Sequence, residues 1–207
     1  MRTKTLLLTA ALSAASLLSS MAAGVTSVNV VGYINVSVPA GFSFIANQLV
    51  GSSSKLSDLI PNPPDETVIY TWDNGFASNG YNLFGDSTWE NGDITLTPGA
   101  GALVFAKSPF TVTFVGEVKQ GQLNTSIAKG FNFVSSQVPQ EGTVSALGYT
   151  PNAGDVLYKW DNGFFAYSWD IFGDSAWDPS EPTLGVGQSA LLFSAAGGSW
   201  NRSFTVN

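Results

Sequence analysis

Two copies of one set of aromatic and polar residues could bind a sugar. An aromatic ring can stack on the apolar face of a pyranose, and carboxylate and amide groups can hydrogen-bond its hydroxyls. The chain supplies these residue types twice, about 88 residues apart. The predicted ligand-binding residues are Trp72, Asp73, Asn74, Asp86 and Trp89 in the first copy, and Trp160, Asp161, Asn162, Asp174 and Trp177 in the second.

The same residue types also have a structural explanation. Tryptophan and phenylalanine fill the cores of small β units, and Asp-Asn-Gly and Gly-Asp-Ser are typical turn sequences. We favour this explanation for any single tryptophan and expect about one aromatic residue in each copy to stay exposed for binding.

The repeated carboxylates raise two other possibilities, a calcium site and a glycosidase. Calcium needs six to eight oxygen ligands, and no calcium-binding loop pattern joins the acidic residues. Asp86 with Glu90, or Asp174 with Glu181, could form a pair of catalytic carboxylates, but a chain with 15 acidic residues contains many such pairs. The sequence therefore predicts no catalytic residue, no metal and no cofactor.

The composition excludes several kinds of chemistry. The chain has 207 residues, no cysteine and no histidine. It can therefore form no disulfide, no thiolate or imidazole metal site and no Ser-His-Asp triad. Because 15 acidic residues face 8 basic ones, nucleic acid is not expected as a partner. A protein that is not an enzyme is the simplest expectation.

The N-terminal segment has the pattern of a signal peptide. Arg2 and Lys4 precede an apolar stretch from Leu6 to Leu18, and small residues follow at positions 20–24. The stretch is too short to span a membrane. We therefore predict a signal peptide over residues 1–23 and a bacterial protein that is secreted, periplasmic or on the cell surface. A secreted chain without cysteine is more typical of bacteria than of eukaryotes.

An internal duplication organises the rest of the chain. The matches keep one order and a nearly constant spacing, so we predict a first β repeat with a leading strand at 24–118 and a second at 119–207, joined by a polar connector from Glu117 to Thr125. Three of the matched pairs are Gly41–Phe44 with Gly130–Phe133, Trp72–Phe76 with Trp160–Phe164, and Phe84–Ser87 with Phe172–Ser175.

Short apolar or alternating runs predict β structure almost throughout. Asp-Asn-Gly after each Trp predicts a hairpin turn, and only Lys55–Ile60 and Thr143–Gly148 look capable of a helical turn. We expect an all-β fold of two tandem antiparallel units, of small-barrel or sandwich type, packed with pseudo-two-fold symmetry. The strand at Val28–Val38 is expected to have no equally strong counterpart before the second unit.

Three segments resemble a recurrent bacterial extracellular module: Gly41–Leu49, Val68–Asp73 and Leu96–Val104. The module has a Gly-aromatic segment, a strand ending in Trp, and a Pro-Gly-x-Gly turn. The preceding Val30–Val36 looks like the start of secreted proteins of unassigned function from Verrucomicrobia and related bacteria. The resemblance implies secretion and β structure and supplies no catalytic residues. The chain departs from the module at Ala102-Leu103 and its second copy, where an aromatic pair is usual.

These observations favour a secreted, non-enzymatic protein of the envelope or extracellular matrix with a structural or adhesive role. The alternative is a carbohydrate-binding accessory module. The expected partners are a polysaccharide or a second copy of the chain, and no membrane span is predicted.

Overall fold

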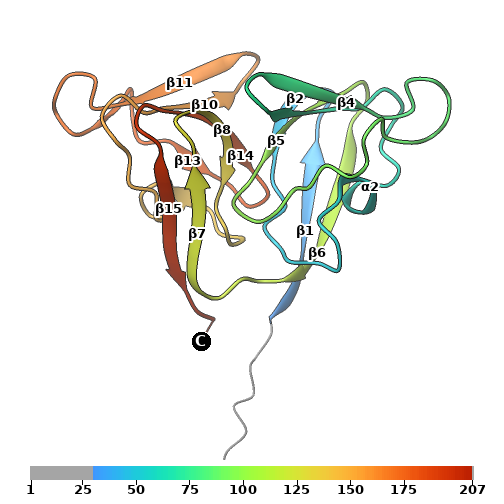
Figure 1. Ribbon diagram of the computed structural model, residues 1–207, viewed down its shortest axis with the longest axis horizontal. Helices are drawn as coiled ribbons and strands as arrows, with labels where there is room; N and C mark the ends of the chain where they lie inside the picture. The colour runs from blue at the N-terminus through green and yellow to red at the C-terminus, as the bar shows by residue number, and fades with distance from the viewer. Residues whose placement is uncertain (1–29, 207) are drawn as a thin grey trace, which may run out of the picture.

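A computed structural model describes residues 30–206 of the chain (Figure 1). This part consists of fifteen strands and one short helix, which confirms the all-β class. The signal peptide expected over residues 1–23 lies outside the described residues. Within residues 30–206, no helix has the length and hydrophobicity that crossing a membrane requires.

The first unit combines a four-stranded antiparallel sheet with a two-stranded ribbon. The sheet has the order β2-β5-β3-β4, and the ribbon pairs β1 with β6. The elements are β1 (Val31–Val38), β2 (Gly41–Ile45), α2 (Leu56–Leu59), β3 (Val68–Trp72), β4 (Phe76–Gly80), β5 (Ala102–Ala106) and β6 (Phe110–Glu117).

The second unit repeats this plan with a five-stranded sheet in the order β12-β11-β10-β14-β8 and a ribbon of β7 with β15. Every sheet is open, so the sandwich-like alternative describes the units better than a closed small barrel. The elements are β7 (Gly121–Ile127), β8 (Gly130–Ser135), β9 (Gly142–Thr143), β10 (Val156–Trp160), β11 (Phe164–Trp169), β12 (Trp177–Asp178), β13 (Thr183–Leu184), β14 (Ser189–Ser194) and β15 (Gly198–Phe204).

The ribbon of the second unit corrects two expectations. Gly121–Ile127, most of which the sequence assigned to a polar connector, is strand β7 and pairs with β15 along its whole length. It is the counterpart of β1, which pairs with β6 in the same way. The strand pattern of β7 is weak in the sequence, because its outward positions are polar and it buries few apolar side chains. The chain between the ribbons is therefore only residues 118–120.

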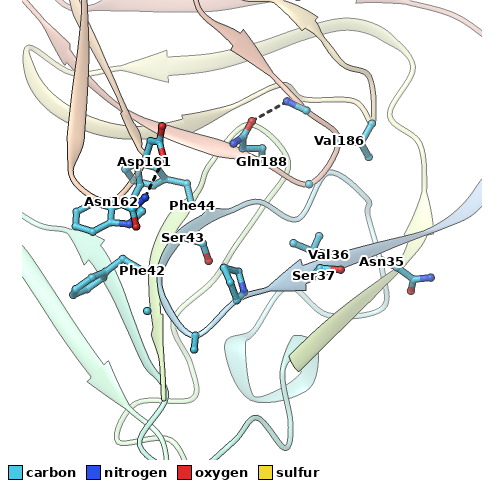
Figure 2. A pocket seen from close by; sticks show the side chains of 16 residues that line it. Asn35, Val36, Ser37, Phe42, Ser43, Phe44, Asp161, Asn162, Val186 and Gln188 are labelled. Atoms are coloured by element: carbon cyan, nitrogen blue, oxygen red, sulfur yellow. Dashed lines mark hydrogen bonds between the residues drawn. The ribbon is translucent and has the colours of Figure 1, made fainter. Parts of the chain in front are cut away.

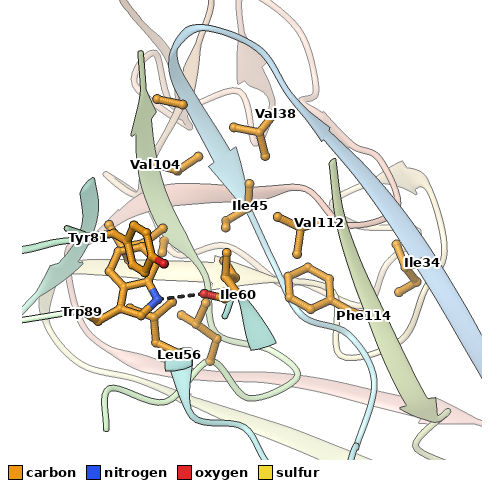
Figure 3. Packing of buried hydrophobic residues seen from close by; sticks show 14 of the residues in the cluster. Ile34, Val38, Ile45, Leu56, Ile60, Tyr81, Trp89, Val104, Val112 and Phe114 are labelled. Carbon is orange, nitrogen blue, oxygen red and sulfur yellow. Dashed lines mark hydrogen bonds between the residues drawn. The ribbon is translucent and has the colours of Figure 1, made fainter. Parts of the chain in front are cut away.

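Each unit has its own core, which lies between the ribbon and the inner face of the sheet. Figure 3 shows the first core, where Ile45 and Val104 of the sheet pack against Val112 and Phe114 of the ribbon. A second cluster, which includes Leu157 and Trp200, fills the same place in the other unit. Because side chains alternate along a strand, each sheet also carries side chains on its outer face, and these do not belong to its unit's own core.

The outer faces of the two sheets cover each other with aromatic rings. The ring centroids of Phe42 and Trp160 lie 5.0 Å apart, and those of the equivalent Phe131 and Trp72 lie 4.9 Å apart. This exchange of matching contacts is the mark of a pseudo-two-fold axis. The expected symmetry of the two units is therefore present.

The axis passes close to Phe44 and its counterpart Phe133, whose ring centroids are 5.8 Å apart. Leu103 and Leu191, also equivalent, complete this buried junction. The junction ties the units into one body that has three apolar clusters, one inside each unit and one between them.

Candidate functional site

Two clefts open where the units meet, and the axis relates them. Each is formed by the hairpin turn of one unit and the first sheet strand of the other. Cleft one has a volume of about 700 Å³ and cleft two about 410 Å³. Their walls contain six of the ten residues that the sequence predicted, namely Trp160, Asp161 and Asn162 in cleft one and Trp72, Asp73 and Asn74 in cleft two.

Figure 2 shows cleft one, in which Asp161 and Asn162 of the second unit face Phe42 and Ser43 of the first. The Oγ atom of Ser43 is buried and has no hydrogen-bond partner among residues 30–206. A buried hydroxyl without a partner carries a desolvation cost. Ser43 is therefore a polar wall residue that the sequence did not single out.

Local backbone geometry fixes the polar groups of both clefts. Asn74 and Asn162 adopt positive φ angles of 56° and 53°, which asparagine tolerates well. Asp73 and Asp161 each donate a backbone N–H to the carbonyl two residues later, at 2.9 Å. The pairing of β3 with β4 and of β10 with β11 then confirms the hairpins predicted at Asp-Asn-Gly, with carboxylate and amide exposed at each tip.

The two clefts differ in charge and size. Cleft two carries Lys129 at its rim, at the position where cleft one has Ala40. It also places Asn132 where cleft one has Ser43. The duplication therefore produced two related but chemically distinct sites, with cleft one the larger and without a lysine in its wall.

The turns before β5 and β14 lock the units together behind the clefts. Gly99 and Gly187 have φ angles of 98° and 74°, and a Cβ atom on either would collide with Thr125 or Val36. Their carbonyls accept backbone N–H groups of the opposite unit, at 3.0 Å and 2.8 Å respectively. Only glycine allows this approach at this backbone conformation.

Two predicted residues, Trp89 and Trp177, are buried and cannot stack on a sugar. The Trp89 indole donates a hydrogen bond of 2.8 Å to the Ile60 carbonyl, inside the first core (Figure 3). Trp177 packs against Trp169 with ring centroids 5.5 Å apart. Sequence alone could not separate these rings from Trp72 and Trp160, because all four tryptophans adjoin a polar turn, Trp72 and Trp160 before one and Trp89 and Trp177 after one.

Asp86 and Asp174 lie away from the clefts, in two matching loops at residues 82–88 and 170–176, which we call the apolar loops. Each loop presents a phenylalanine to solvent: Phe84 is 84% exposed and Phe172 is 75% exposed. Neither phenylalanine is among the ten ligand-binding residues predicted from the sequence. Their identical place in both copies was the signal that could have found them.

Asp86 in the first apolar loop lacks the raised pKa of a general acid. Hydrogen bonds from the Thr88 hydroxyl and backbone N–H hold the pKa of Asp86 below its usual value, whereas a general acid needs a raised pKa. Glu90 accepts the Gly80 N–H at 2.9 Å, a structural contact. Among residues 30–206 no three carboxylates are grouped as a metal would require.

Comparisons with models of protein families, with curated proteins and with solved structures found no match to this chain.

Proposed function

We propose that the chain is a secreted, non-enzymatic β-repeat protein of the cell envelope or extracellular matrix, with a structural or adhesive role. The arrangement of the termini supports this most strongly. Both ends of the described chain leave from one side of the molecule, and the hairpins and the apolar loops lie toward the opposite side (Figure 1). Such an arrangement presents a duplicated surface away from whatever holds the termini.

Duplication makes this surface bivalent. Two linked contacts bind more strongly than one because the second forms at a high effective concentration. The junction rings keep the two units in a fixed relation, so the two contacts need no flexible linker. A rigid bivalent surface suits attachment to an extended or repetitive partner.

The test is to locate the protein and measure attachment. Full-length protein is expressed in a bacterium, and the envelope, matrix and medium fractions are probed with an antibody. We expect the mature chain in the envelope or matrix fraction, and we expect beads coated with it to adhere to cells or matrix. Protein that is found only free in the medium, with coated beads that do not adhere, would contradict the proposal.

Carbohydrate binding is the second candidate, and the clefts favour it. Each cleft combines a partly buried tryptophan with an exposed carboxylate and amide, the groups that a sugar requires. Trp160→Ala and Trp72→Ala should each weaken binding when tryptophan fluorescence is followed during titration with soluble polysaccharides. Affinity that survives both substitutions would contradict a role for the clefts.

A further inference from the structure

We infer that the two apolar loops bind an uncharged polysaccharide, with the rings of Phe84 and Phe172 stacking on its pyranose units. This inference rests on the carbohydrate-binding candidate above and moves the main contacts from the clefts to the loops. Phe84 and Phe172 are the two most exposed large apolar side chains of the described residues.

Both loops are rigid, and their hydrogen bonds match. The first is closed at its base by the Asn82 N–H, which donates to the Thr88 carbonyl at 2.8 Å. The Asn82 side chain also accepts the Ser87 N–H at 2.7 Å. Asp170 makes the same two contacts in the second loop, at 2.8 Å and 2.7 Å. The backbone that carries each ring is fixed by these bonds, so binding must order only the ring's own side-chain rotation.

The fold explains the other residues that the two loops share. Gly85 and Ser87 have positive φ angles of 78° and 55°, as do their counterparts. Asp86 caps the Thr88 N–H at 3.2 Å, and Trp89 fills the core. Leu83 lies against Gly80. Among the residues that both loops share, the phenylalanine is the one with no role in the fold.

Phenylalanine is kept at this position, while some other exposed positions of the repeat have changed. The exposed Ala77 of the first unit, for example, corresponds to the exposed Phe165 of the second. A ring exposed to water has no packing role, so its retention in both copies points to a partner outside the chain.

The surroundings of the rings favour a sugar over a lipid. Asp86 and Ser87 are exposed next to Phe84, as Asp174 and Ser175 are next to Phe172. Inserting the ring into a bilayer would bring a carboxylate to the same depth, at a high desolvation cost. A polysaccharide instead offers hydroxyl donors to that carboxylate while its C–H face covers the ring. The formal charge of −7 also disfavours anionic surfaces.

The positions of the loops favour a long or repetitive partner. The loops project at the two ends of the long axis in Figure 1, one after β4 in green and one after β11 in orange. One polysaccharide surface can therefore engage both loops at once, whereas a short oligosaccharide would occupy one.

The experiment measures retention of the full mature protein on insoluble cellulose, chitin and β-1,3-glucan. We expect binding to at least one of them. Phe84→Ala and Phe172→Ala should each weaken it about 5-fold or more, and the double variant about 50-fold, as expected when bivalent contact is lost. Phe84→Trp should retain binding, and Phe84→Leu, which removes the flat ring, should weaken it about as much as Phe84→Ala. Phe165→Ala is the matched control, because it removes another exposed ring and leaves the loops intact.

Three outcomes would overturn the inference. Binding that survives the double variant and is lost in Trp160→Ala would place the site in cleft one and leave carbohydrate binding intact. Retention on none of the polysaccharides would remove the carbohydrate candidate together with the inference. Binding to phosphatidylcholine vesicles that Phe84→Leu preserves would identify a lipid partner instead.

Discussion

The two units keep matching apolar loops but differ at several interior positions. Both keep an apolar residue followed by Phe-Gly-Asp-Ser in the apolar loops. Inside, Thr67 of the first unit corresponds to Asp155 of the second, and both are fully buried. On the ribbons, Val112 corresponds to Trp200, as the pairing of β6 with β1 and of β15 with β7 shows.

Folding alone does not explain why the exposed ring of the apolar loops is kept while these buried positions have changed. Surface loops normally vary more than cores, while a core can exchange residues if its volume and pattern are kept. An exposed ring that both copies keep, while interior positions such as Thr67/Asp155 differ, is consistent with a constraint from an outside partner. The comparison predicts that interior substitutions change stability differently in the two units, whereas loop substitutions change binding alone.

The largest expected effect is that of Trp200→Ala. Trp200 is completely buried, and its indole donates a hydrogen bond of 2.8 Å to the Leu147 carbonyl. Removing it should lower the free energy of unfolding by about 3–5 kcal/mol, measured by urea denaturation. Val112→Ala in the first unit should cost only about 2 kcal/mol. Equal losses would show that the two interiors depend equally on this position.

The next effect concerns the buried carboxylate of Asp155. It accepts hydrogen bonds from the Tyr149 hydroxyl, the Asn152 N–H, the Ser194 hydroxyl and the Ala195 N–H, over 2.6–3.2 Å. Asp155→Ala would take this partner from the buried Tyr149 and Ser194 hydroxyls and from two partly buried N–H groups, so we expect a loss of about 3 kcal/mol in unfolding free energy. Urea denaturation measures the loss.

Thr67→Ala is the matched control in the first unit. The Thr67 hydroxyl makes one hydrogen bond, which it donates to the Pro64 carbonyl at 2.7 Å. Its loss should cost about 1 kcal/mol. If Thr67→Ala costs as much as Asp155→Ala, the carboxylate network of the second unit contributes no more to stability than the single Thr67 hydroxyl contributes in the first unit.

The parts of the fold that the sequence predicted are those set by local chemistry. Asp-Asn-Gly determines a hairpin turn through the backbone preferences of asparagine and glycine, so β3–β4 and β10–β11 could be predicted. Strand β7 was harder to predict, because its alternation of Leu123, Thr125 and Ile127 with polar residues includes little apolar bulk and its strand structure depends on pairing with β15. Such distant pairing leaves little trace in the residues of one strand.

The candidate sites were predictable only in part, for a related reason. Trp160 and Asp161 are neighbours in sequence, but cleft one exists because Phe42 and Ser43 of the other unit face them. No local pattern predicts which surfaces two repeats bring together. The burial of Trp89 likewise follows from its contact with the distant Ile60.

High pH provides a smaller test of the difference between the interiors. Burial, together with the hydrogen bond and charge of Asp155, raises the pKa of the Tyr149 phenol well above its usual value. The folded protein therefore keeps a proton that the unfolded chain releases near pH 10, and stability falls as pH rises beyond that point, by up to about 1.4 kcal/mol per pH unit. Urea denaturation from pH 9 to pH 11 should show this fall in the native protein.

Tyr149→Phe removes the titrating group and supplies the control. This variant should be less stable at pH 7, by about 1 kcal/mol, because the Asp155 carboxylate loses one donor. Its stability should fall less steeply above pH 10 than that of the native protein. Because the other tyrosines are common to both proteins, two parallel pH profiles would contradict the claim that Tyr149 causes the loss of stability at high pH.

The smallest expected effect is that of Phe165→Ala, which removes an exposed ring on β11. Because Phe165 is 48% exposed and the first unit has Ala77 at this position, the unfolding free energy should change by no more than about 0.5 kcal/mol. Retention on polysaccharide should also stay unchanged, in contrast to Phe84→Ala. Urea denaturation and the retention assay measure both quantities on the same samples. A loss of binding as large as that of Phe84→Ala would show that any exposed ring suffices, and the two loops would then have no special role.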